Sequence, residues 1–184
     1  MEDDFELIIR KIQTEDPTRI SSGSSCFQPL SSFLKRDAKN CQNSHIATTY
    51  VIGRTDPDKD TIISVLGYIT ITNSEIDVQD TYALYDCPHA DRYDSLPAVK
   101  IARLLVSTDY RKNGLGRNLL NFVLALVMDE IVPRVGCRFI IVDAKEEAIS
   151  FYEKMGFSFL DTDTNRGKKE PIMFLDLYKY NGNS

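Results

Sequence analysis

The sequence has few of the residues that build metal or disulfide centres. Its 184 residues include four cysteines and two histidines. The cysteines are widely spaced and form no Cys-x-x-Cys pair, which argues against both a disulfide framework and a zinc site. We therefore expect no metal ion, and reduced, mostly structural cysteines in a cytoplasmic protein. The four cysteines are Cys26, Cys41, Cys87 and Cys137.

The sequence also lacks the features of membrane and secreted proteins. No run of about 18 apolar residues occurs, so no segment is expected to span a membrane. The first residues, Met-Glu-Asp-Asp, are acidic and do not have the basic-then-apolar arrangement of a signal peptide. The length and the 42% apolar content fit one globular domain, residues 1–184, with a full hydrophobic core.

A basic surplus is missing as well. The formal net charge is −5, which argues against indiscriminate binding to nucleic acid. The charge is nevertheless uneven, because the segment 100–117 holds five cations and one acid and therefore carries +4. The rest of the chain sums to −9. This pattern favours a small anionic ligand at the basic segment over a long polyanion.

The basic segment contains a characteristic loop. Val99–Val106 is an apolar run that predicts a strand, and Ser107–Tyr110 predicts a short turn. Arg111–Arg117 follows with two glycines one residue apart, and an apolar helix begins there. Glycines let the backbone approach a bulky ligand, and the free N–H groups of a helix start favour anions. The loop lacks the Gly-Lys-Ser/Thr ending and the third glycine of the two commonest nucleotide-binding loops. We expect a diphosphate-binding loop, although a turn that merely needs glycine remains the alternative.

The remaining pattern predicts strands and helices that alternate late in the chain, after an early run of antiparallel candidates. This order indicates a mixed α/β (α+β) fold. The predicted strands are Phe5–Ile12, His45–Gly53, Thr61–Thr72, Val99–Val106, Cys137–Val142, Phe157–Leu160 and Ile172–Tyr178. Three helices are predicted. The first runs from Pro29 to about Cys41, and the second is Leu115–Val132, which Pro133 ends. The third begins at a capping box, Asp143–Glu146, and ends at Gly156.

Two motifs resemble the GCN5-related N-acetyltransferases. The Arg-x-x-Gly-x-Gly of residues 111–116 is similar to that family's acyl-CoA loop, and Ala148–Phe157 is similar to its later Phe-Tyr-x-x-x-Gly-Phe helix. The resemblance implies a mostly antiparallel sheet with one parallel strand pair splayed around the acyl-CoA site, helices on both faces, and acetyl-CoA as cosubstrate. It also implies that the cofactor-binding residues are Leu104, Leu105, Val106, Arg111, Lys112, Asn113, Gly114, Leu115, Gly116 and Arg117.

Tyr152 is the expected catalytic residue. A tyrosine hydroxyl with a pKa near 10 is protonated at neutral pH and can donate a proton to a departing thiolate. The family's signature tyrosine corresponds to this position. Because Ala148, Tyr152 and Met155 share one helical stripe, packing in the core is the alternative role.

No general base is evident. The strand Val99–Val106 has no glutamate, and Arg103 stands there instead, either as a member of a buried ion pair or in a functional role. Glu75, Asp77 and Asp143 are candidates by position alone. A lysine with a pKa near 10.4 is rarely deprotonated at pH 7, whereas an α-amine near 7.7–8.0 often is. An enzyme without a strong base should therefore prefer α-amino or otherwise weakly basic acceptors.

A closer resemblance covers about residues 24–178. Cys26–Leu34, Thr49–Ile52, Leu96–Val106 and Val142–Ala148 are similar to acetyltransferase toxins of bacterial toxin–antitoxin pairs. This implies aminoacyl-tRNA as a possible acceptor, a homodimer and an antitoxin partner. Transfer to the amine of a small molecule, peptide or protein is the broader reading, and a non-catalytic acyl-CoA-binding module is the alternative of another class. We expect Asn73–Pro97 to shape the acceptor site. The basic residues that could contact an anionic acceptor, besides the 111–117 loop, are Lys35, Arg36, Lys39, Arg166, Lys168 and Lys169.

Overall fold

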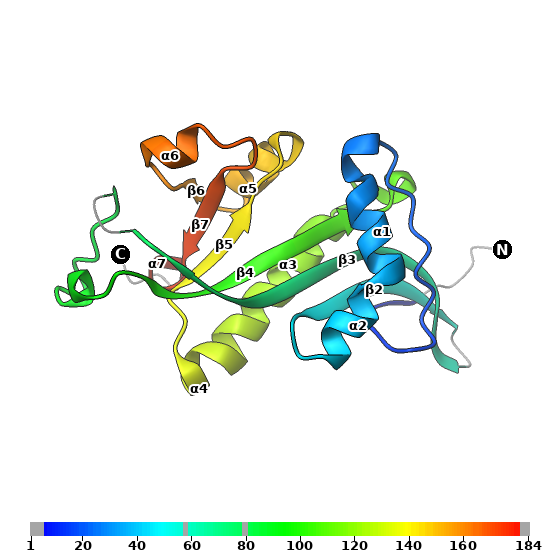
Figure 1. Ribbon diagram of the computed structural model, residues 1–184. Helices are drawn as coiled ribbons and strands as arrows, with labels where there is room; N and C mark the ends of the chain where they lie inside the picture. Colours follow the sequence, from blue (N-terminus) through cyan, green and yellow to red (C-terminus); the bar gives the residue numbers. More distant parts are fainter. Residues whose placement is uncertain (1–5, 57–58, 79–80, 181–184) are drawn as a thin grey trace. The chain divides into compact units, whose positions relative to one another are not determined.

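The computed structural model describes residues 6–56, 59–78 and 81–180 (Figure 1). Seven strands form one sheet in the order β1-β2-β3-β4-β5-β7-β6. Strand β4 pairs parallel with β5, whereas the pairs β1–β2, β2–β3, β5–β7 and β6–β7 are antiparallel. The strands are β1 Glu6–Lys11, β2 Thr48–Asp56, β3 Lys59–Ile76, β4 Leu96–Val106, β5 Phe139–Asp143, β6 Ser158–Phe159 and β7 Ile172–Asp176. The mixed α/β fold with one parallel pair is thus confirmed.

Seven α-helical segments accompany the sheet in the described ranges. They are α1 Gln28–Arg36, α2 Ala38–Asn43, α3 Leu115–Leu126, α4 Val132–Val135, α5 Ile149–Lys154, α6 Asp163–Arg166 and α7 Leu177–Tyr180. None of the described helices is long and apolar enough to cross a membrane.

The chain divides into two compact units. Unit 1 consists of Met1–Thr72 and Ala102–Ala125, and unit 2 of Asn73–Ile101 and Leu126–Ser184. Strands β3 and β4 each run through both units.

In unit 1, helices cover both faces of the strands. Leu34 of α1 and Ala38 of α2 are buried in a cluster with Val51 of β2 on one face. Figure 1 shows α1 and α2 on this side of β2. The next residue back on β2, Tyr50, points to the opposite face, where its ring lies 5.0 Å from that of Phe122 on α3. This alternation is what a strand buried on both faces requires.

Unit 2 has its own apolar core. Phe139 at the start of β5 and Phe174 on β7 pack edge to face, with ring centroids 5.7 Å apart. The ring of Tyr82, from the long segment between β3 and β4, lies 5.0 Å from Phe174. The other buried members of this cluster are Ile76, Val78, Ala98, Ile141 and Leu160.

Two predicted helix boundaries are wrong. Pro133 does not end the helix, because the chain widens into a π-helical turn at Val127–Ile131 and places Pro133 in the first turn of α4. Proline lacks an N–H, and the first turn of a helix does not need one. The true stop is Gly136, with φ +84. The capping box also fails, since Asp143 ends β5 and its carboxylate is ion-paired with Lys100.

Candidate active site

The loop Arg111–Arg117 has an unusual backbone in unit 1. Lys112 has φ +67 and Gly114 has φ +80, both in the left-handed region. In the described part of the chain, no acceptor is bonded to the backbone N–H groups from Lys112 to Arg117, and the first paired donor after them is Asn118 N, 3.0 Å from Gly114 O. A run of free N–H groups at the start of α3 is an anion-binding arrangement.

The surroundings of this loop suit a bulky anion. A Cβ atom added at Gly114 would meet no heavy atom within 4 Å, so the space above the loop is open. The side chains of Lys112, Asn113 and Arg117 are exposed, while Leu115 is buried and fixes the first turn of α3. These residues fit the diphosphate of a CoA derivative: the backbone supplies the donors, and two cations flank them.

Arg111 has a different position from the other cations of the loop. Its guanidinium donates to Ser22 O at 2.6 Å and to Val106 O at 3.2 Å, and it lies 4.9 Å from the centre of the Phe27 ring. All three contacts are within unit 1. The side chain therefore ties the segment before α1 to the end of β4, and so positions the loop.

The three predicted residues at the end of β4 lie where its pairing with β5 has stopped. The parallel register runs only from Ala98–Phe139 to Ile101–Val142. Leu105 is buried in the core cluster with Leu34, whereas Leu104 and Val106 are half-buried. The β4 edge from residue 102 onward thus has no register with β5. Apart from the oxygens of Ala102 and Val106, which accept from Arg103 and Arg111, its main-chain groups are available to a ligand.

Tyr152 lies on α5 in unit 2. Its ring is 4% exposed and packs edge to face on Phe151 and Phe157, at 5.2 and 5.3 Å. Burial raises the pKa of the Tyr152 hydroxyl above its usual value near 10. The hydroxyl has no hydrogen-bond partner among the described residues. A protonated hydroxyl that no protein group occupies is suited to be a general acid.

The acidic candidates for a base differ in their contacts. Asp143 is ion-paired with Lys100. Glu75 accepts a hydrogen bond from Ser95 Oγ at 2.7 Å. Asp77 is exposed at the end of β3.

Arg103 makes no ion pair in the described part of the chain, so the alternative of a buried ion pair has no support there. Its guanidinium lies 4.9 Å from the centre of the Phe33 ring and donates to Ala102 O at 2.7 Å. The Phe33 ring stacks on Tyr68 at 6.4 Å. Leu30, Phe33 and Leu34 recur at helical spacing in the sequence, and this signal places Phe33 on the inner face of its helix.

Several of the predicted basic contacts are engaged elsewhere. Lys39 donates to Thr14 O at 2.6 Å and to Asp16 O at 2.9 Å, and therefore holds the segment after β1. Arg166 is ion-paired with Asp161 and Asp163. Lys35 and Arg36, in the last turn of α1, are exposed and have no partner in the described ranges.

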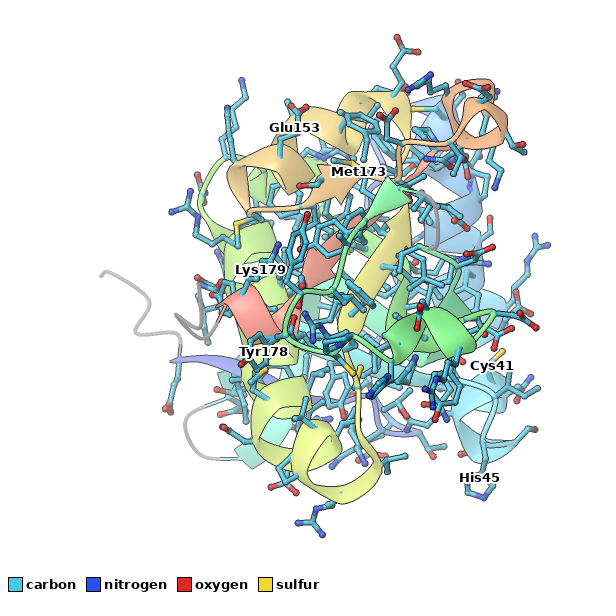
Figure 2. All side chains as sticks on the ribbon, turned by 90° about the vertical axis from the view of Figure 1, so that its left-hand side faces the viewer. Cys41, His45, Glu153, Met173, Tyr178 and Lys179 are labelled. Carbon is cyan, nitrogen blue, oxygen red and sulfur yellow. The ribbon has the colours of Figure 1, made fainter. Side chains whose placement is uncertain are left out.

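The segment Asn73–Pro97 does not surround Tyr152. Its contacts lie where β5 begins and β7 ends. Arg138, just before β5, pairs with Asp86 of the segment and with buried Asp176 of β7. Asp176 also accepts a hydrogen bond from the hydroxyl of Tyr82, another residue of the segment, at 2.9 Å. Lys179 of α7 lies over the Tyr82 ring, and Figure 2 shows it beside Tyr178. Helix α5 follows the opposite end of β5 (Figure 1). The cavity of about 750 Å³ in this segment is therefore remote from Tyr152, and an acceptor site shaped by the segment is not supported.

Comparison with known proteins agrees with this architecture. The family model for the acetyltransferase (GNAT) domain matches residues 58–159, more than half of the chain. The protein therefore belongs to the GNAT acetyltransferase family and is an acyltransferase. A search of curated proteins found no significant match.

Three solved structures share the fold. AtaT complexed with acetyl-methionyl-tRNAfMet is 21% identical, with a TM-score of 0.79 over 97% of this chain and 99% of that one. A tyrosine-to-phenylalanine variant of KacT is 21% identical, with a TM-score of 0.80 over 97% and 99%. Another such variant, of the AtaT toxin bound to the C-terminus of the antitoxin AtaR and acetyl-CoA, is 21% identical, with a TM-score of 0.71 over 94% and 94%.

Proposed function

We propose that this protein is an acetyl-CoA-dependent N-acetyltransferase that transfers the acetyl group directly to a primary amine. The observation that carries the proposal is the run of unpaired N–H groups from Lys112 to Arg117, next to the open space at Gly114. Residues 1–184 would then act as a single catalytic domain.

The proposed roles follow from the chemistry. The N–H groups of the loop bind the diphosphate, with Lys112 and Arg117 beside it. Main-chain groups of Leu104–Val106 hold the acyl carrier and polarise the acetyl carbonyl, a contribution on the order of 3 kcal/mol for one donor. The amine nitrogen attacks the carbonyl carbon, the C–S bond breaks, and Tyr152 gives its proton to the departing sulfur.

The acceptor is an amine that is already partly deprotonated. Of the base candidates, Asp143 is held in an ion pair with Lys100, and Glu75 is bonded to Ser95. An α-amine with a pKa near 8 supplies roughly a tenth of its molecules as free base at pH 7, whereas a lysine supplies far fewer. The excess proton of the new amide nitrogen passes to solvent, and Tyr152 takes up a proton from solvent to regain its acid form.

The amino group of an aminoacyl-tRNA is the more specific candidate. It is an α-amine, and AtaT, which shares the fold over nearly its whole length, was solved with acetyl-methionyl-tRNAfMet. An antitoxin partner belongs to this candidate, since AtaT was also solved with an antitoxin segment. A homodimer and a cytoplasmic location are proposed together with it. Exposed Lys35 and Arg36 offer phosphate contacts.

Calorimetry with acetyl-CoA tests the proposal. Gly114→Asp places a carboxylate at the open position, where it repels the diphosphate, and we expect affinity to fall at least about tenfold, near 1.4 kcal/mol. Gly136→Asp is the matched control, because Gly136 has the same sign of φ (+84) and equally open surroundings. Equal affinity of Gly114→Asp and the parent would contradict the loop assignment.

The acceptor is tested separately with radiolabelled acetyl-CoA and methionyl-tRNA, small amines and peptides in parallel. Label on methionyl-tRNA alone would support the toxin-type activity, and label on a small amine alone would exclude it. Acetyl-CoA binding without transfer to any acceptor would favour the binding-module alternative.

A further inference from the structure

Among the described residues, no acidic group neutralises the charge of Arg103. The side chain is half-buried, it makes no ion pair in the described part of the chain, and its guanidinium donates to the neutral oxygen of Ala102. Removing part of a cation from water is costly unless an opposite charge or hydrogen bonds compensate for it. An unneutralised guanidinium of this kind is stabilised when an anion binds to it.

The side chain is held in one orientation. Phe33 lies beneath the guanidinium, with 4.9 Å between the central carbon and the ring centre. Phe33 in turn stacks on Tyr68, whose hydroxyl donates to Leu30 O at 2.7 Å. Stacking on an aromatic ring leaves the edge of the guanidinium available, and its planar fork matches a carboxylate or phosphate.

The position of Arg103 on β4 relates it to the acyl group. Side chains alternate along a strand, so Arg103 shares a face with Leu105, which packs with Leu34 of α1. It directly precedes Leu104, the first of the residues proposed to hold the acyl carrier. The guanidinium donates to Ala102 O and therefore lies against the backbone of β4, two residues before Leu104.

We infer that Arg103, supported by Phe33, is an acceptor-binding residue that selects amines carrying an oxyanion close to the amino group. The inference rests on the proposed function and names the acceptor class: the oxyanion is the carboxylate of a free amino acid or a phosphate of an aminoacyl-nucleotide. Exposed Lys35 and Arg36 on α1 give the same unit further positive charge.

Three acceptors are compared. Methionine carries a carboxylate, methionyl-tRNA carries phosphates, and methioninamide carries no oxyanion. Arg103→Gln should raise the KM of the anionic acceptor that the parent uses by about 10- to 100-fold, because a hydrogen bond between charged groups is lost. The KM of methioninamide and the affinity for acetyl-CoA should stay within about twofold. Arg103→Lys should recover part of the loss, because it keeps the charge but not the fork.

Arg134→Gln is the matched control, since Arg134 is an exposed arginine on α4 paired with Glu130. A merely structural role of Arg103 predicts an equal loss for all three acceptors, and that result would overturn the inference. A parent that uses only methioninamide would overturn it as well.

Calorimetry of the CoA-loaded protein with N-acetylmethionine and with the acetylated tRNA needs no turnover. Binding of either product by the parent and by Arg134→Gln, and its loss in Arg103→Gln, supports the inference, while equal binding or none overturns it. If the parent protein does not bind acetyl-CoA, the proposed function itself is rejected. Thermal unfolding of each variant shows whether it is folded.

Discussion

At the scale of single residues, two tyrosines show how one side chain type serves two purposes. Burial raises the pKa of both Tyr68 and Tyr152. The Tyr68 hydroxyl donates to Leu30 O at 2.7 Å and is therefore committed to packing α1 on β3. The Tyr152 hydroxyl has no partner among the described residues and remains available to a substrate. Apolar spacing in the sequence could not separate these roles, because both rings are core members, Tyr68 on a strand and Tyr152 on a helix.

The protonation of Tyr152 predicts the shape of the pH profile. The acid form donates the proton, and a pKa raised above 10 keeps that form through the alkaline range. We expect the transfer rate of the parent to rise as the acceptor amine deprotonates and to show no falling limb below pH 10. Tyr152→Phe should lose about 100-fold in kcat while its affinity for acetyl-CoA is unchanged.

Tyr85→Phe serves as the control for this profile, since Tyr85 is 89% exposed. A falling limb between pH 8 and 9, or a Tyr152→Phe rate equal to that of the parent, would remove Tyr152 from the proton transfer.

At the scale of elements, the apolar pattern predicted most strands and helices, and several errors arise from contacts between residues far apart in the sequence. The helix expected from Pro29 to Cys41 is broken at Asp37 into α1 and α2, although Leu34 of α1 and Ala38 of α2 are buried in one core cluster. The capping box failed because Asp143 pairs with Lys100, a residue 43 positions away that no local pattern reveals. Arg103 shows the same limit, since its contact with Phe33 depends on the tertiary placement of α1.

The end of α5 depends on Gly156, as its position in the motif indicated. Its φ of +87 is in the left-handed region, and an added Cβ would meet Leu175 only at 3.5 Å, an ordinary contact. Gly156→Ala should therefore lower the free energy of unfolding by about 1–2 kcal/mol through backbone strain alone. Gly167→Ala is the control, because Gly167 has φ −82 and its nearest contacts are at 3.9 Å. Urea unfolding measures both, and an equal effect would refute the strain.

The anchor between the 81–96 segment and β7 depends on Asp176. This buried carboxylate accepts from Arg138 at 2.7 Å and from Tyr82 at 2.9 Å. Asp176→Ala removes one of the two carboxylates that pair with Arg138 and leaves only Asp86. The free energy of unfolding should therefore fall by about 3 kcal/mol. Asp161→Ala removes an exposed partner of Arg166 and should change it by less than about 1 kcal/mol. Similar urea midpoints for the two variants would show that the buried network is not stabilising.

At the scale of the whole molecule, charge decides between acceptor classes. The net charge of −5 disfavours the binding of a polyanion. In the structure, several of the basic side chains are engaged in other contacts and are not available to bind a polyanion. Lys39 holds the chain after β1, Arg111 positions the glycine loop, and Arg166 is paired with acids. Within unit 1, the described cations near α1 that are neither bonded to another segment of the chain nor assigned to acetyl-CoA are Lys35, Arg36 and Arg103.

This small set of free cations predicts how transfer to tRNA depends on salt. About three phosphate contacts correspond to a slope of about 2 to 3 when log KM for methionyl-tRNA is plotted against log salt concentration. The KM of methioninamide should be nearly flat over the same range, because no phosphate is neutralised. Arg36→Gln should lower the tRNA slope by about one, whereas Arg134→Gln should leave it unchanged. A slope near zero would exclude phosphate contacts from recognition, and one above about 5 would show that basic groups beyond these three bind the tRNA.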